Sequence, residues 1–266
     1  MRSPVDTIAA PPFPKDLRWV NVAPLRMEQQ ARRPVLVVFW DVCDPGSLRT
    51  LPYLRAWHGR YGGGETGLRV VAVHAPSRPD VSGADAVERA VERLGIEHPV
   101  ALDHDFLLWK AYANPGWPSR YLFAPRLKLF EVHHGEGDYP GTERAIQELL
   151  ELDEPLTPFA DPADDDDVPI VVPTAGVDGA HSGPYAAGEV WVVVDGPGTV
   201  TVNGRTLELD RVGAHRVVRH ERHEAGEVEI VAEPGVEVLR TVFLPGLAEL
   251  APGPGAPKDP GAATHQ

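Results

Sequence analysis

The only cysteine of this 266-residue chain, Cys43, lies where an apolar segment ends and a helix is expected to start. A cysteine near a helix N-terminus can act as a nucleophile, because unpaired N–H groups and the helix dipole stabilise its thiolate. Disulfide exchange also needs a second thiol to resolve the mixed disulfide. Two interpretations stay open: an incidental or structural cysteine, which we favour, and a monothiol oxidoreductase or redox sensor that resolves through an external thiol.

The elements that flank Cys43 follow from local sequence. Val35–Trp40 is a continuous apolar run rich in β-branched residues, which is typical of a strand buried on both faces. Asp44 is a good N-cap, and Pro45 suits the first helical position. Apolar residues then recur at helical spacing up to Tyr61. The negative charge of Asp44 is expected to raise the pKa of the neighbouring thiol.

The remainder of the first half alternates between strand and helix patterns. Their order predicts an α/β fold in which helices flank a mixed sheet. The expected strands lie at residues 19–22, 68–74, 99–102, 120–123 and 127–133. Helical segments are expected at residues 25–32, 84–94, 106–112 and 142–152, the last with Thr142 as its N-cap.

The second half has a different pattern. Residues 153–168 are acidic and proline-rich, which favours a solvated linker over a binding tail. Asn203-Gly204 is a strong two-residue hairpin signal. The short strands expected after residue 169 predict a small all-β antiparallel sandwich, and they lie at residues 190–194, 198–202, 205–209, 215–219, 228–232 and 236–243. The predicted divisions are a leader at 1–17, domains at 18–152 and 169–247, and a disordered tail at 248–266.

Several sequence segments, in order, resemble the TlpA-like thioredoxin-fold proteins, and within them the soluble part of the DipZ-type thiol-disulfide proteins. The resemblance covers about residues 18–152 and implies a thioredoxin-like fold. The segment that ends Gly235–Phe243 resembles the carbohydrate-binding-module-like sandwich that follows this domain in DipZ. The segments that carry the first resemblance are Phe39-Trp40 with Leu48–Leu54, Gly67–His74, Ala90–Ile96, Pro99–Asp103, Trp117–Leu122 and His134–Tyr139.

The chain departs from this family at its redox motif. The resemblance places the two family cysteines at Asp44 and Ser47, with Pro45 and Gly46 between them, so Cys43 lies one residue too early. A carboxylate at the N-cap stabilises a helix by about 0.5–2 kcal/mol relative to alanine. The motif Asp44-Pro-Gly-Ser47 therefore indicates a degenerate active site whose helix cap has been restored.

The dipeptide Trp117-Pro118 matches the family's cis-proline position, which lies beside the dithiol. The resemblance implies a groove lined by Trp40, Trp117 and Pro118 that holds an extended peptide. The sequence thus predicts a non-catalytic module that binds a protein or peptide partner in this groove. The alternative is a monothiol oxidoreductase that acts through Cys43.

Charge and composition exclude several other classes. A formal net charge of −14 disfavours binding to nucleic acid or to an anionic membrane. No stretch approaches the roughly 18 apolar residues of a membrane helix, and no signal peptide is evident, so a cytoplasmic location is expected. No phosphate-binding or dinucleotide glycine motif is present, and no cofactor is expected.

Several histidines and aromatic residues are further candidates for metal or sugar binding. His133 and His134 are adjacent on a strand and point to opposite faces, so they do not favour a shared metal. The cluster around His215, His220 and His223 is better explained by a solvated hairpin tip than by zinc, and no metal is expected. Sugar binding needs an exposed aromatic ring, for which Tyr185 is the available candidate, because Trp191 is expected in the core.

Overall fold

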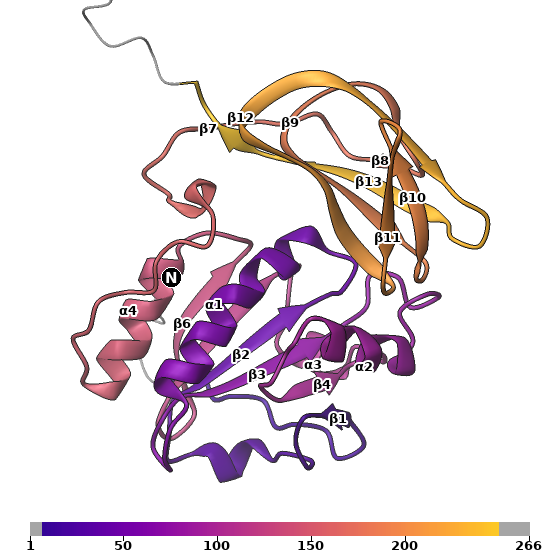
Figure 1. Cartoon of the computed structure of the whole chain (residues 1–266). Coiled ribbons are helices and arrows are strands. Elements are labelled where there is room, and N and C mark those ends of the chain that lie inside the picture. The colour runs from indigo at the N-terminus through magenta and orange to yellow at the C-terminus, as the bar shows by residue number, and fades with distance from the viewer. Residues whose placement is uncertain (1–6, 250–266) are drawn as a thin grey trace, which may run out of the picture.

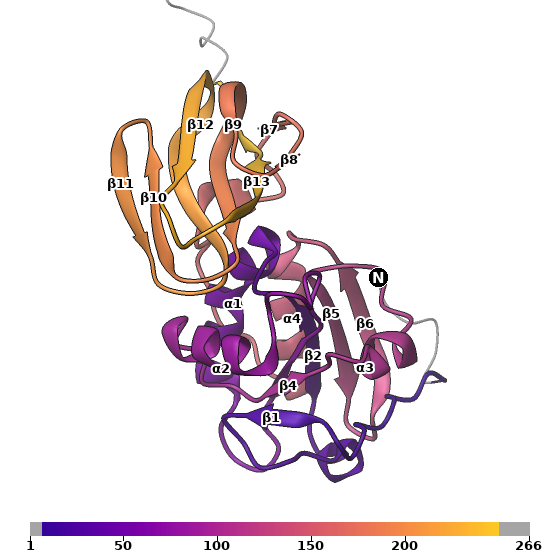
Figure 2. The same cartoon turned by 90° about the vertical axis from the view of Figure 1, so that its right-hand side faces the viewer.

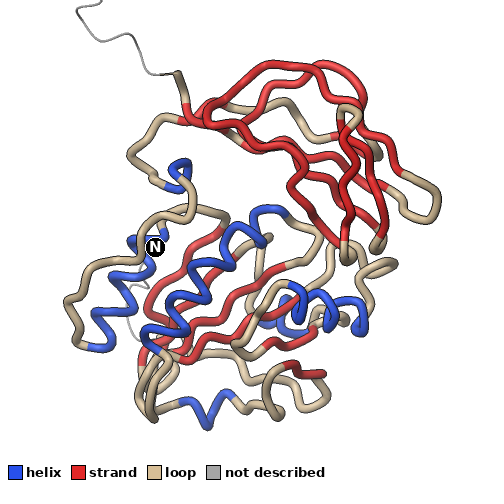
Figure 3. The backbone as a smooth tube through the Cα atoms, in the orientation of Figure 1, coloured by secondary structure: helices blue, strands red, loops and turns tan. Residues whose placement is uncertain are grey.

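The computed structural model describes residues 7–249 and confirms the predicted fold class, an α/β domain followed by an all-β antiparallel domain. Figure 3 shows the division: helices accompany the lower sheet, and strands make up nearly all of the upper domain. The first six residues of the expected leader, and the expected tail from residue 250 onward, lie outside the described residues.

The α/β domain is built on a six-stranded mixed sheet with the order β1-β4-β3-β2-β5-β6. β2 lies at its centre, parallel to β3 and antiparallel to β5, and all six of its residues are buried. A strand covered on both faces needs the continuous apolar run seen in the sequence. The strands are β1 (Arg18–Val20), β2 (Val35–Trp40), β3 (Arg69–His74), β4 (Val100–Leu102), β5 (Ser119–Ala124) and β6 (Lys128–His134).

Helices cover both faces of this sheet (Figure 2). Leu36, Val38 and Trp40 of β2 belong to the same apolar cluster as residues of α1, α2 and α4. Val35, Val37 and Phe39 point to the opposite face, where α3 lies. The helices are η1 (Met27–Gln30), α1 (Pro45–Tyr61), α2 (Ala84–Arg93), α3 (Leu107–Ala111), α4 (Tyr139–Leu150) and η2 (Pro162–Asp164).

The predicted start of α4 is wrong. The helix begins at Tyr139 with Asp138 at the N-cap, and Thr142 lies inside the first turn, where its backbone N–H donates to the Asp138 carbonyl at 3.0 Å. Pro140 was the informative residue, because proline is favoured in the first turn of a helix. Thr142 itself is buried.

The second domain contains a six-stranded antiparallel sheet with the order β11-β10-β12-β9-β13-β8 and a two-stranded sheet, β14-β7. Asn203 and Gly204 form the two-residue turn between β10 and β11, as predicted. The strands are β7 (Ile170–Val171), β8 (Val177–Asp178), β9 (Ser182–Val194), β10 (Gly198–Val202), β11 (Arg205–Leu209), β12 (Gly213–Ala232), β13 (Val238–Leu244) and β14 (Gly246–Leu247).

The hairpin tip predicted at residues 220–223 is wrong. The two short strands expected on either side of it belong to one strand, β12, which pairs along the 13-residue strand β9. The pairing shifts register between Arg216 and Val218 and again between Arg219 and Glu224. Because many residues of this stretch are charged and exposed, it lacks the apolar alternation by which a strand is recognised.

The two domains are in direct contact at the end of β2. The backbone N–H of Ala214 donates to the carbonyl of Val42 at 2.8 Å. Trp191 and Val193 of β9 belong to the same buried apolar cluster as Val42 and the α/β domain. The start of β12 therefore covers the segment that leads from β2 into α1, as Figure 1 shows.

Candidate functional site

The start of α1 is capped as the sequence predicts. Asp44 is the N-cap, and its carboxylate accepts hydrogen bonds from the Ser47 backbone N–H and from the Ser47 hydroxyl, both at 2.7 Å. Pro45 occupies the first helical position. Ser47 Oγ in turn accepts from the backbone N–H of Asp41 at 3.1 Å. Asp44 and Ser47, which stand where the resemblance places the two cysteines, are thus bonded to each other.

The Cys43 thiol is buried and disfavoured as a thiolate. Only 6% of the residue is exposed, and it packs in the main apolar cluster of the α/β domain. Burial raises the pKa of Cys43, and the negative charges of Asp41, Asp80 and Asp44 act in the same direction. The positive charge of Arg78 opposes them without reversing the shift.

A buried carboxylate behind Cys43 was missed by the sequence analysis. Asp41 is completely buried and accepts hydrogen bonds from the backbone N–H groups of Cys43 at 3.2 Å and Ser77 at 3.0 Å, and from the Ser77 hydroxyl. His74 Nε2 lies 3.2 Å from Asp41 Oδ1. Burial alone would raise the pKa of Asp41, but the hydrogen bonds and charge of His74, with Ser77, lower it.

A signal for this cluster was available in the sequence. Asp41 directly follows β2, and His74 ends β3, its parallel neighbour. Residues at the same end of adjacent parallel strands lie side by side, so the pair was foreseeable once the two strands were assigned. Asp41 therefore places a negative charge close to Cys43, whereas a reactive thiol needs a positive charge nearby to stabilise its thiolate.

A cavity of about 440 Å³ lies between the start of α1 and the second domain. The peptide bond between Trp117 and Pro118 is cis. Of the three expected groove residues, Trp117 lines the cavity, whereas Pro118 and Trp40 do not. Trp40 is 1% exposed and packs edge-on against His74, with ring centroids 5.1 Å apart. The second domain lines the opposite side with Asp178, Val193, Leu239, Arg240 and Val242.

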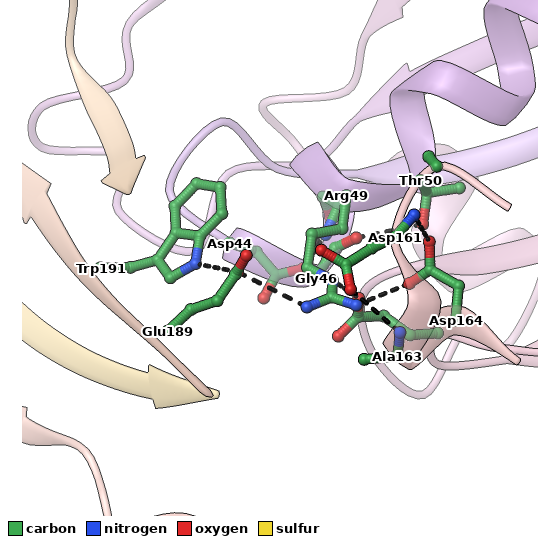
Figure 4. Close-up of polar contacts among 12 residues, drawn as sticks. Asp44, Gly46, Arg49, Thr50, Asp161, Ala163, Asp164, Glu189 and Trp191 are labelled. Carbon is green, nitrogen blue, oxygen red and sulfur yellow. Dashed lines mark hydrogen bonds and ion pairs between the residues drawn. The ribbon is translucent and has the colours of Figure 1, made fainter. Parts of the chain in front are cut away.

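Arg49 joins three distant segments beside this site (Figure 4). Its Nε lies 2.8 Å from Glu136 Oε1, its Nη2 2.6 Å from Asp164 Oδ1 and its Nη1 3.5 Å from Glu189 Oε2. Burial raises the pKa of Glu136 to about 7, against the effect of Arg49, and the neighbouring Asp and Glu charges add to the rise. Arg49 therefore connects α1 with the β6–α4 loop, the interdomain segment and β9.

The interdomain segment is not solvated throughout, in contrast to the expectation. Asp164, the first of four consecutive aspartates, is buried and accepts a hydrogen bond from the Tyr53 hydroxyl at 2.7 Å as well as the ion pair from Arg49. Asp161 caps η2 by accepting from the Ala163 N–H at 2.9 Å. The segment is thereby anchored to α1.

Trp191 and Tyr185 of the second domain are buried and bonded to neighbouring side chains. Trp191 is buried as expected, at the contact with the α/β domain, and its Nε1–H donates to Glu189 at 2.8 Å. Tyr185 is 7% exposed, stacks on Phe243 and has its hydroxyl 2.7 Å from His220 Nε2. Neither ring offers the exposed platform that sugar binding needs.

Within residues 7–249, no group of three or more His, Cys, Asp or Glu side chains could hold a metal ion. Among the helices of the same part of the chain, none is both long enough and apolar enough to cross a membrane.

Known proteins with similar sequences match about half of this chain. No family model matches the chain. It is 30% identical over 135 residues to protein DipZ of Mycobacterium tuberculosis, covering 50% of this chain and 19% of DipZ. It is 26% identical over 131 residues to the thiol-disulfide oxidoreductase ResA of Halalkalibacterium halodurans, covering 49% of this chain and 68% of ResA. The chain thus spans about a fifth of the length of DipZ.

The fold has a counterpart among solved structures. The crystal structure of a thioredoxin-like superfamily protein superimposes with a TM-score of 0.51 and 18% identity, over 56% of this chain and all of the other. At this identity the match concerns the fold alone.

Proposed function

We propose that this chain, a thioredoxin-like protein related to the thiol-disulfide oxidoreductases, is a redox-inactive binding module for a peptide or protein segment. The observation that carries the proposal is that a hydrogen-bonded aspartate and serine, Asp44 and Ser47, stand in place of two thiols. Asp44 and Ser47 hydrogen-bond to each other at the positions where the family resemblance places the cysteines. Neither side chain can form or resolve a disulfide.

The buried thiol supports the same proposal. Cys43 is 6% exposed, and both burial and the charge of Asp41 raise its pKa. A reactive cysteine needs partial exposure and a lowered pKa. Cys43 therefore acts as an apolar core residue.

The binding site of this proposal is the 440 Å³ cavity between the domains. Trp117 and the side chains of Leu239 and Val242 give it apolar walls, and Arg78 and Arg240 also line it. An extended segment would place apolar side chains against these walls.

A single-thiol oxidoreductase is the alternative function, favoured by one observation: Cys43 borders the same cavity. Such an enzyme would need the Cys43 thiolate to attack a bound disulfide and an external thiol to release the product. Both steps require a thiol that ionises near neutral pH.

Alkylation of Cys43 by iodoacetamide at a series of pH values, read by intact mass, separates the two functions. We expect native protein to react slower than urea-unfolded protein by about two orders of magnitude, because the buried thiol reacts only after local opening. The unfolded chain serves as the control, with a midpoint near the ordinary value of about 8.5. A native midpoint well below that value would establish an activated thiolate and overturn the redox-inactive proposal.

Peptide binding is tested by selecting ligands from a random peptide library and assaying the selected peptides against two variants. Leu239→Arg fills the cavity and is expected to weaken binding by at least about tenfold. Val231→Arg is the matched control, since Val231 is an exposed apolar residue of the same domain and does not line the cavity. Equal binding by both variants would place the peptide elsewhere.

A further inference from the structure

A second and larger cavity, of about 520 Å³, lies between the domains on the side of Arg49. Its apolar lining includes Leu48 and Pro52 of α1 and Trp191 and Leu209 of the second domain. Its polar wall carries Arg211, Arg216 and Arg219. A concave apolar surface with a few converging polar groups is the usual form of a small-molecule site.

A β-bulge brings two of these arginines to the same wall. Arg216 and Arg219 are three residues apart and would face opposite sides of a regular strand. The register shift after Arg216 inserts one residue, so Arg216 pairs with Trp191 and Arg219 with Glu189. Glu189 and Trp191 are two residues apart on β9 and share one face, which is the face that lines the cavity. Bulges commonly reorient side chains in this way at functional sites.

The carboxylates of this wall are already engaged. Glu189 accepts from Arg216 at 2.6 Å and from Trp191 at 2.8 Å, and also pairs with Arg49. Asp161 accepts from Arg219 at 2.8 Å while it caps η2. Each of these carboxylate groups therefore serves several donors.

The guanidinium groups, by contrast, keep donors to spare. An arginine has five N–H donors, and Arg216 and Arg219 each make one side-chain contact to a carboxylate. Arg211 has only 10% of its side chain exposed; its Nη1 lies 2.9 Å from His215 Nδ1 and its Nη2 donates to the Ala214 carbonyl at 2.9 Å, whereas its Nε has no hydrogen-bond partner among residues 7–249. Its carboxylate neighbour, Asp210, is 3.3 Å away and largely exposed. Arg216 and Arg219 therefore keep guanidinium N–H donors that no carboxylate of the wall occupies, and an anionic ligand would pair with them.

We propose that this cavity binds a small monocarboxylate with an apolar body, its carboxylate against Arg211, Arg216 and Arg219 and its body on the floor formed by Leu48, Pro52 and Trp191. The apolar floor selects against simple inorganic anions, and the arginines select against neutral lipids. Glu208 also lines the cavity, and its charge weakens the attraction. The site does not depend on the function proposed for the Trp117 cavity, from which it is distinct.

Decanoate is the probe, titrated into the full chain by calorimetry, with the indole N–H resonance of Trp191 as a second readout. We expect one site per chain. Arg211→Met and Arg219→Met are each expected to weaken binding by about tenfold, since each removes charge-assisted hydrogen bonds. Arg219 is half-exposed, so its variant tests the site even if Arg211→Met fails to fold. Glu208→Gln is expected to tighten binding by about two- to threefold.

The matched control is Arg205→Met, which removes an exposed arginine of β11 outside the cavity and is expected to leave decanoate affinity unchanged. The site is supported if decanoate shifts the Trp191 indole resonance in the parent protein and binds more weakly to Arg219→Met. Decanol that binds as tightly as decanoate overturns it, because the arginines would then contribute nothing. Absence of decanoate binding at millimolar concentration, or equal binding by Arg219→Met and Arg205→Met, also overturns it.

Discussion

Replacement of Arg49 by methionine is expected to lower the free energy of unfolding by about 3–5 kcal/mol, the range for breaking a buried ion pair. Arg49 is 13% exposed, and its partners Asp164 and Glu189 are 3% and 5% exposed. Methionine fills a similar volume but cannot donate hydrogen bonds. The buried carboxylates then lose an ion-pair partner that water cannot replace, which destabilises the folded state. Urea unfolding followed by tryptophan fluorescence measures the change.

Arg18→Met is the matched control. Arg18 also pairs with two carboxylates, Asp85 and Glu88, but 48% of its side chain is exposed. Solvent-exposed ion pairs contribute roughly 0–1 kcal/mol, so this variant should unfold close to the parent. Equal losses in the two variants would show that Arg49 is no more important to stability than a surface residue.

The second large effect is expected at Gly213, the first residue of β12. Its φ is +113°, and a Cβ there would lie 2.4 Å from the Val42 carbonyl oxygen. Gly213→Ala must therefore separate the second domain from the segment before Cys43, at a cost of about 2–4 kcal/mol in unfolding free energy. Separation should also speed alkylation of Cys43, because that residue packs in the apolar cluster that the two domains share.

Gly226→Ala controls for the loss of a glycine in the same strand. Gly226 has an ordinary φ, and the nearest atoms to a new Cβ belong to Tyr185 at 3.7 Å or more. Alanine there should be close to neutral for stability and should leave Cys43 alkylation unchanged. If Gly213→Ala behaves in the same way, the close approach to Val42 is not what holds the two domains together.

Local signals predicted the elements that position the site. Asp44 and Pro45 marked the start of α1, because capping and the first helical turn depend on neighbouring residues. The apolar run of β2 identified the central strand. Where two local signals compete, the sequence does not decide between them: Thr142 suits an N-cap, but Pro140 lies in the first turn of α4, which begins at Tyr139.

Interactions between distant segments could not be predicted. The partners of Arg49 come from residues 136, 164 and 189, and no sequence pattern links these positions. Asp164 looks like any residue of a solvated acidic run until Tyr53 and Arg49 are placed beside it. The resemblance predicts Trp40 in a groove, whereas the alternation along β2 puts it in the core beside Leu36 and Val38.

The apolar cluster that runs from α1 through Val42 into Trp191 and Val193 also limits how this chain can be divided. Sequence composition changes at the acidic segment, yet the hydrophobic core continues across that boundary. Cutting there would expose apolar faces on both fragments to water. The two halves are therefore not interchangeable modules, and any substitution that reshapes the start of α1 must also be compatible with the strand packed on it.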